Sequence, residues 1–258
     1  MRRRLSLVFA HPDDDSFGLG GSIAKHRDDT DVQVILASSG EAGMIADPSL
    51  ATRENLGEVR EGESRASYAA LGVSPQQHLL RYPDGGLAGV PRDEIVGKVA
   101  SLLLEFRPDV VVTFGPEGVT KHEDHVTMHE VGTEAFHRAR EGANGGFSRL
   151  FYVGIPASEI ERYRELQRMA GMEPFDPEAP FQPRGVPDET IAVEADCSGV
   201  WKTKHEALLA HRTQSFEIEE IPEQLRPLVF GTEYFVQAWP ARDPGTERFR
   251  DLFEGVFG

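Results

Sequence analysis

Residues 5–16 of the chain, LSLVFAHPDDDS, decide the fold. The apolar run at 5–10 lacks polar alternation, which predicts a short strand buried on both faces of a parallel sheet. A histidine, a proline and three aspartates follow the run at once. Polar side chains at the carboxyl end of such a strand indicate where the sheet meets its ligands.

Three further apolar runs resemble the first, and they lie at 32–37, 109–114 and 150–153. The sequence around them predicts helices at 16–27, 52–71, 92–106, 123–140 and 199–211. This alternation indicates an α/β fold of the Rossmann-like, doubly wound type, with a mainly parallel sheet and helices on both faces. Right-handed crossovers then put the carboxyl ends of the strands along one edge.

The composition argues against several classes of protein. The chain has 258 residues with 43 acidic and 27 basic side chains, and its formal net charge of −16 opposes binding to nucleic acid. No window approaches the roughly 18 consecutive apolar residues of a membrane span, so we expect neither a membrane partner nor a signal peptide. Cys197 is the single cysteine, which excludes an intrachain disulfide and fits the cytoplasm.

We predict one domain, 1–258, with a proline-rich surface loop at 172–187 that is either a linker or a lid. The aromatic segment 230–239 lines an interface, a substrate cleft or the core, and the core is the favoured reading. A homo-oligomer is left open by the sequence.

The end of the first strand crowds His11 against the carboxylates of Asp13, Asp14 and Asp15. Like charges this close repel one another unless a proton or a cation neutralises them, and a divalent metal does so most completely. The alternative is an aspartate-rich turn that caps the next helix. The histidine directly before the acids favours the metal.

A second polar cluster, KHEDH at 121–125, follows the strand at 109–114 on the same edge. Side chains from two distant clusters therefore converge, and three of them supply the two histidines and one aspartate that a catalytic zinc needs with water in its open position. Iron(II) and cobalt suit the same donors.

Two other motifs fail on inspection. The helical zinc motif H-E-x-x-H would need a histidine where Val126 stands. A dinucleotide fingerprint that starts at Gly18 would need Gly or Ala where Ile23 stands, and carboxylates that would repel a pyrophosphate already occupy the turn. We therefore expect no nicotinamide or flavin cofactor.

AHPDD at 10–14 and the His-x-Asp-His pattern at 122–125 resemble the zinc-dependent deacetylases of the LmbE/PIG-L family. Further landmarks follow in the family's order between residues 5 and 214: Gly40-Glu41, Arg60-Glu61-Gly62-Glu63, Tyr82-Pro83-Asp84-Gly85 and the stretch 204–214. The resemblance implies a hydrolase that removes the N-acetyl group from a small molecule containing N-acetylglucosamine.

The resemblance also implies roles for individual residues. His11, Asp14 and His125 match the family's three metal ligands, and Asp13 matches the carboxylate that activates the zinc-bound water. The family pattern has a glutamate where this chain has Asp15, which shortens a supporting carboxylate.

The substrate side of the site is implied in the same way. His122 matches the histidine beside the substrate carbonyl, and we expect Asp124 to orient it and keep it protonated. Arg60 and Asp84 match residues that contact the hydroxyls of the sugar. Glu123 stands where the family has a proline, which loosens the turn.

Two alternatives keep the same site. One is an amidase that cleaves a larger acyl group from a thiol conjugate of an amino sugar. The other is a non-catalytic, metal-dependent sugar-binding module, although Asp13 and His122 would then have no purpose.

Overall fold

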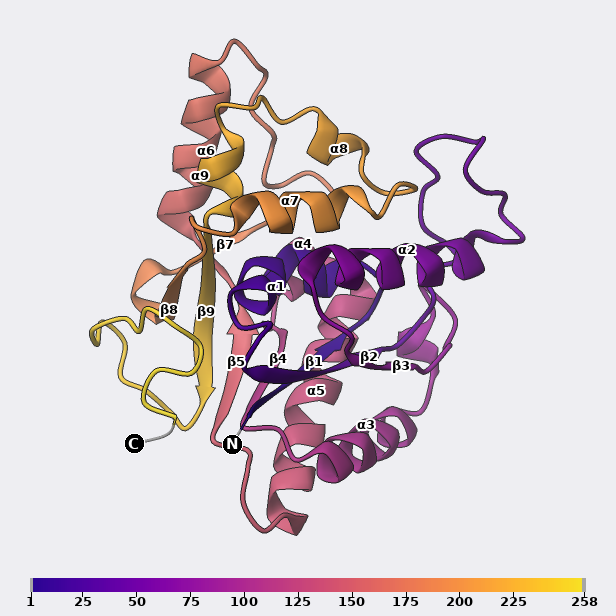
Figure 1. Ribbon diagram of the computed structural model, residues 1–258, viewed down its shortest axis with the longest axis vertical. Coiled ribbons are helices and arrows are strands. Elements are labelled where there is room, and N and C mark those ends of the chain that lie inside the picture. Colours follow the sequence, from indigo (N-terminus) through magenta and orange to yellow (C-terminus); the bar gives the residue numbers. More distant parts are fainter. Residues whose placement is uncertain (1, 257–258) are drawn as a thin grey trace.

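The computed structural model describes residues 2–256, apart from the side chains of residues 216 and 217. A sheet of seven strands runs in the order β3-β2-β1-β4-β5-β9-β8 (Figure 1). The first five of these strands pair in parallel, whereas β9 is antiparallel to both of its neighbours. The strands are β1 Arg3–Phe9, β2 Thr30–Leu36, β3 Gln76–Leu79, β4 Val110–Phe114, β5 Arg149–Val153, β8 Ile191–Asp196 and β9 Thr232–Trp239, with β6 Ile155–Pro156 and β7 Gly185–Val186 in a separate pair.

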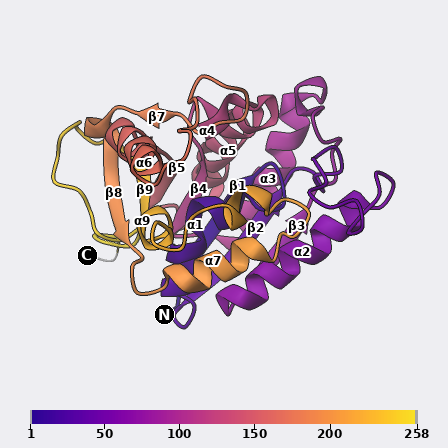
Figure 2. The same ribbon diagram turned by 90° about the horizontal axis from the view of Figure 1, so that it is seen from above.

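Helices cover both faces of the sheet. On one face, α7 (Trp201–Leu209) lies against α1 (Asp14–Lys25) and α2 (Leu56–Leu71), while α3 (Arg92–Phe106) and α5 (Glu123–Gly142) pack together on the other (Figures 1 and 2). The remaining helices are α4 Gly118–Lys121, α6 Ala157–Met169, α8 Phe216–Glu219, α9 Arg226–Phe230 and the 3₁₀ turns η1 Leu87–Gly89 and η2 Asp188–Thr190. In the described residues, no helix is both long and apolar enough to cross a bilayer.

The predicted fold class is confirmed, and each of the four predicted strands and five predicted helices has a counterpart. The helix at 92–106 has the predicted ends, whereas the one predicted from residue 52 begins at Leu56. Segment 230–239 contains the whole of β9, which lies inside the sheet, and its side chains of Phe230 and Phe235 are buried, as the core prediction requires.

The glycines that failed as a dinucleotide fingerprint have a packing role in α1. A Cβ on Gly20 would lie 3.1 Å from Lys204 Cγ, and one on Gly21 would lie 2.7 Å from Cys197 Cβ. Glu233, on β9, accepts hydrogen bonds from the Gly21 amide and from the Lys204 ammonium. This close contact fixes α1 against α7 and β9, and with it the acidic first turn of α1.

Candidate active site

The two polar clusters meet at the carboxyl ends of β1 and β4. These strands are parallel neighbours, with Leu5 paired to Val110 and Leu7 to Val112. The first cluster follows β1 directly, and the second lies at the start of α5, shortly after β4 ends at the same edge. His11 and His125, 114 positions apart in the chain, are therefore in contact.

Three side chains, those of His11, Asp14 and His125, bring their metal-binding atoms close together. His11 Nδ1 lies 3.2 Å from His125 Nε2 and 3.4 Å from Asp14 Oδ2, and His125 Nε2 lies 3.2 Å from Asp14 Oδ1. Two ligand atoms held about 2.0–2.1 Å from one tetrahedral ion lie about 3.3 Å apart, so these spacings match such a set. The three side chains are only 9% to 11% exposed.

The other nitrogens of the two rings fix their tautomers. His125 Nδ1 lies 2.9 Å from the carbonyl oxygen of Gly118, which can only accept, so this nitrogen carries the proton. His11 Nε2 lies 3.0 Å from an Asp84 oxygen and 3.4 Å from an Asp124 oxygen, and it is the protonated nitrogen for the same reason. With these far nitrogens protonated, the nitrogens that face Asp14 can give up their protons and offer lone pairs to an ion held between the three side chains, as metal-ligating histidines do.

The local charges also suit a cation. Burial opposes ionisation of Asp14, but the charge of His125 and hydrogen bonds from both histidines hold the pKa of Asp14 well below its usual value. Burial likewise opposes protonation of His11, yet hydrogen bonds to Asp124, Asp14 and Asp84 raise the pKa of His11 well above its usual value. A proton and a divalent cation therefore compete for this site, and the donor set fits the cation.

Two further sets of side chains could hold an ion: His11 with His122 and His125, and His11 with Asp84 and Asp124. Within each set, the possible donor atoms lie within 4.8 Å of one another. In the first set, Nδ1 of His122 already accepts the backbone N–H of Asp124 at 3.2 Å. In the second, the carboxylates contact the far nitrogen of His11. The geometry favours the set that contains Asp14.

Asp13 lies beside this cluster in a strained conformation. Its φ of 128° is rare for a residue with a side chain, and such strain costs about 1–3 kcal/mol. Burial raises the pKa of Asp13 to about 6, although the charge of Arg60 opposes the rise. A carboxylate that titrates near neutrality can accept a proton from water and return it later.

Arg60 lies behind Asp13 and is only 3% exposed. Its Nη2 donates to Asp13 Oδ2 at 3.0 Å and to the Pro12 carbonyl at 2.9 Å, and its Nη1 donates to the Gly40 carbonyl at 2.9 Å. The guanidinium therefore holds Asp13 in place from inside the protein.

Asp124 is held by the backbone of the loop after β3. Its oxygens accept the N–H groups of Gly85 at 2.7 Å and Leu87 at 3.1 Å. Asp84, in the same loop, accepts the N–H of Ala42 at 2.8 Å. Both carboxylates thus present fixed acceptors to His11 Nε2 and orient that ring.

His122 is half-buried at the start of α5, where its Nδ1 caps the helix. Burial lowers the pKa of His122, and the charges of His11 and His125 lower it further. A neutral His122 that accepts at Nδ1 carries its proton on Nε2, where it can donate a hydrogen bond. The exposed ring of Phe181, in the loop predicted at 172–187, lies 5.5 Å from the His122 ring.

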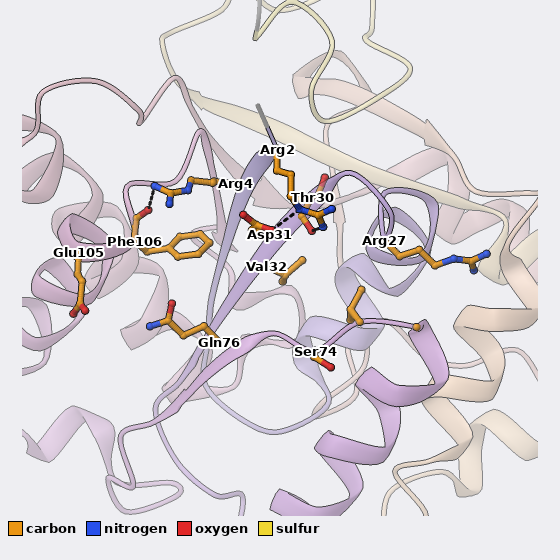
Figure 3. A pocket seen from close by; sticks show the side chains of 12 residues that line it. Arg2, Arg4, Arg27, Thr30, Asp31, Val32, Ser74, Gln76, Glu105 and Phe106 are labelled. Carbon is orange, nitrogen blue, oxygen red and sulfur yellow. Dashed lines mark hydrogen bonds and ion pairs between the residues drawn. The ribbon is translucent and has the colours of Figure 1, made fainter.

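A cavity of about 500 Å³ lies at the opposite edge of the sheet, at the starts of β1 to β3 (Figure 3). Two of its three arginines are bonded to backbone carbonyls: Arg2 donates to the Asp28 and Thr30 oxygens, and Arg4 to the Phe106 oxygen. This cavity has no histidine or cysteine in its lining. It therefore lacks the chemistry found at the carboxyl edge.

The model of the GlcNAc-PI de-N-acetylase family, PIG-L, matches residues 6–136. This chain belongs to the PIG-L family. A 1D-myo-inositol 2-acetamido-2-deoxy-alpha-D-glucopyranoside deacetylase of Salinispora arenicola is 31% identical to it, over 98% of this chain and 92% of that protein.

Two solved structures share the PIG-L chain's fold. The N,N′-diacetylchitobiose deacetylase of Pyrococcus horikoshii has a TM-score of 0.60 and 20% identity, covering 98% of this chain and 86% of its own. The 4-carboxy-2-hydroxymuconate hydratase GalB of Pseudomonas putida KT2440 has a TM-score of 0.64 and 18% identity, covering 96% and 100%. A deacetylase and a hydratase thus share this fold, so the fold alone does not decide the reaction.

Family membership confirms the expected resemblance and the expected function, hydrolysis of an N-acetyl amide bond in a small molecule that contains N-acetylglucosamine. The enzyme class, a deacetylase, is confirmed with it. The donor set at the site indicates a divalent metal.

Some of the expected site residues also have partners inside this PIG-L chain. Arg60 and Asp84, expected at the sugar hydroxyls, bind Asp13, His11 and backbone groups, and their sugar contacts stay predictions. The carboxylate of Asp124 contacts His11, and burial lowers the pKa of His122, so the expected protonation of His122 by Asp124 is opposed by burial and also stays a prediction.

The two departures from the family pattern leave the three donors intact. Asp15 is fully buried, and burial raises its pKa to about 7, although the side chain of Tyr68 opposes the rise. Glu123 is exposed at the first position of α5, where a negative charge suits the helix N-terminus.

Proposed function

We propose that this chain deacetylates an N-acetylglucosamine that is linked to a polyol, with a divalent cation held by His11, Asp14 and His125. The observation that carries this is the convergence of two imidazole nitrogens and one carboxylate, at spacings of 3.2 to 3.4 Å. Zinc is the first candidate for the ion, because the donors and their spacing suit it. Iron(II) is the second.

Asp13 is the proposed general base. When bound, the cation supplies Lewis acidity that polarises the acetyl carbonyl and makes a water molecule more acidic. Asp13 has a strained backbone conformation, and burial raises its pKa to about 6, so its carboxylate can take the proton of that water. Arg60 keeps the carboxylate oriented throughout.

His122 is the proposed hydrogen-bond donor to the carbonyl oxygen as negative charge develops there. Its Nδ1 is engaged by the helix cap, which leaves Nε2–H available. A neutral imidazole is a weak acid, so we assign the return of the proton to the leaving amine to Asp13. His122 thus polarises the carbonyl, and Asp13 carries the proton.

The polyol has a matching cavity at the same edge. A cavity of about 510 Å³ is lined by Ser39, Glu41, Gly57, Glu58, Glu61 and Arg81. Glu41 accepts the N–H of Asp84 at 2.9 Å, which links this cavity to the shell around His11. Carboxylate acceptors beside an arginine donor suit the many hydroxyls of a cyclitol, and the Salinispora relative is named for an inositol glycoside.

The test is acyl release by metal-reconstituted protein from a matched panel. We expect acetate from N-acetylglucosaminyl inositol, less from N-acetylglucosamine alone, and loss of activity with a chelator that zinc or iron(II) restores. Preferential release of a larger acyl group from a thiol conjugate would favour the amidase alternative. Binding without any product would favour the sugar-binding module. A cytoplasmic location, a homo-oligomer and a single domain over 1–258 stay predictions.

A further inference from the structure

The family landmark at 204–214 ends in residues 211–214, which contact the elements around the site but supply none of its predicted ligands. Thr213 donates to Glu63 on α2 through its N–H at 2.8 Å and its hydroxyl at 2.7 Å. Gln214 Nε2 donates to the Met44 carbonyl at 2.7 Å, in the loop after β2. The segment thus joins α2 to the loop that carries Glu41.

His211, at the start of this segment, has an unusual environment. It is only 2% exposed, and neither ring nitrogen has a hydrogen-bond partner in the described residues. Buried polar atoms in native proteins almost always have a partner, which is often an ordered water. His211 therefore marks a place where a partner is needed.

Arg60 has a matching unpaired group. Its two Nη atoms are bonded, but Nε is buried and has no partner in the described part of the chain. Arg60 lies one helical turn before Glu63, to which Thr213, two residues after His211, is bonded. Burial, together with the charge of the nearby Arg60, lowers the pKa of His211 to about 3. His211 is therefore a neutral ring with one donor and one acceptor nitrogen near an unpaired N–H.

We infer that one buried water bridges Arg60 Nε and the acceptor nitrogen of His211, which makes His211 a positioning residue for Asp13. The Nε–H donates to the water, and the water donates to the imidazole. This bridge pairs the one nitrogen of the guanidinium that has no partner in the described residues, and Nη2 of the same group holds the Asp13 carboxylate. The catalytic part of this inference rests on the proposed role of Asp13 as general base; the water does not.

The activity test compares His211→Phe, which keeps a ring without nitrogen, with His211→Gln and His211→Asn, which keep an amide donor and acceptor. His205→Phe is the matched control, because His205 is also buried with an unpaired Nε2 but packs against Phe230 instead. We expect His211→Phe to keep its metal and its KM within about threefold and to lose roughly 10- to 100-fold in kcat, since a small misplacement of a catalytic group has that effect. One amide variant should recover most of the loss, and the control should change kcat by less than about twofold.

A wild-type kcat in His211→Phe, or an equal loss in His205→Phe, would overturn the positioning role. A crystal structure of the wild-type protein at high resolution tests the bridge directly, even where a variant does not fold. A water within about 3.2 Å of both Arg60 Nε and a His211 nitrogen supports it, and a dry contact between the two side chains refutes it. If the water is present but the wild-type protein releases no acyl group, the proposed function fails and the bridge does not.

Discussion

Replacing Arg60 by lysine distinguishes the two roles considered for this arginine, which are orientation of Asp13 and contact with the sugar. In the structure its fork donates to Gly40, Pro12 and Asp13 from two nitrogens. A lysine ammonium is a single point of charge and cannot span these acceptors together. The substitution therefore keeps the positive charge but weakens the hydrogen bonding that orients the Asp13 carboxylate.

The expected size follows from the bond that is lost. A hydrogen bond to a charged group contributes about 1.5–3 kcal/mol, and one pKa unit corresponds to about 1.4 kcal/mol. Arg60 stabilises the ionised form of Asp13, so weakening it raises the pKa of Asp13 above its present value of about 6. The rise should be about 1–2 units. A bound cation lowers this pKa in both proteins, so the difference between them is the quantity to measure.

The assay is the pH profile of kcat and of kcat/KM for acetate release, with the metal content measured in each sample. Asp13 must be ionised to act as a base, so the acid limb should move to higher pH by about 1–2 units in Arg60→Lys, while KM stays within about threefold. Arg65→Lys is the control, because Arg65 is an exposed arginine on the same helix as Arg60 and lies outside both the site and the proposed polyol cavity. An acid limb that stays in place while KM rises would refute our reasoning and restore the sugar contact.

Three further predictions concern the acids and the ligands. Asp13→Asn should keep its metal and lose roughly 10²- to 10⁴-fold in kcat, the usual effect of a positioned base, which steady-state kinetics with elemental analysis will check. His125→Ala should lose the metal, whereas His129→Ala, one turn further along α5 with Nδ1 bonded to the Phe114 carbonyl, should retain it; stoichiometric metal in His125→Ala would contradict the ligand set. Folding raises the pKa of Asp15 from 3.8 to about 7, so its contribution is present at low pH and is lost as the pH rises through this window. Asp15→Asn should therefore gain stability over the wild-type chain between about pH 4 and 7, up to the order of 4 kcal/mol by denaturant unfolding of the metal-free proteins, and a constant difference across that range would contradict the raised pKa of this buried carboxylate.

The parts of the fold that the sequence predicts are those with strong local patterns. The residues of β1, β2 and β4 are nearly all buried, so each strand contains a mostly apolar run that is visible in the sequence. By contrast, β3 is the polar stretch QQHL, and most side chains of β9 are only half-buried. The position of such segments in the sheet depends on tertiary pairing, so propensity reveals the parallel strands β1, β2, β4 and β5 and misses the parallel edge strand β3 and the antiparallel strands β8 and β9.

In the site, too, some features can be predicted from the sequence and others cannot. The meeting of His11 and His125 follows from strand order, because both clusters lie at the carboxyl ends of neighbouring parallel strands. The partners of Arg60 and Asp124 do not follow from it. They depend on backbone atoms of Gly40, Gly85 and Leu87, whose positions are set by loop conformation and carry no side-chain signal. Resemblance supplies a role for a residue, but only the coordinates give the direction in which its side chain points.

The balance of charge explains why Asp13 is the acid that handles the proton. Asp14, Asp84 and Asp124 have lowered pKa values and stay ionised near neutral pH. With Asp13, these carboxylates carry four negative charges, and a divalent cation together with Arg60, which pairs with Asp13, supplies three positive ones. Burial raises the pKa of Asp13 to about 6, so of the four it is the carboxylate that most readily takes a proton. The site is thus nearest to neutrality when Asp13 has taken a proton from water, the state in which it can protonate the departing amine.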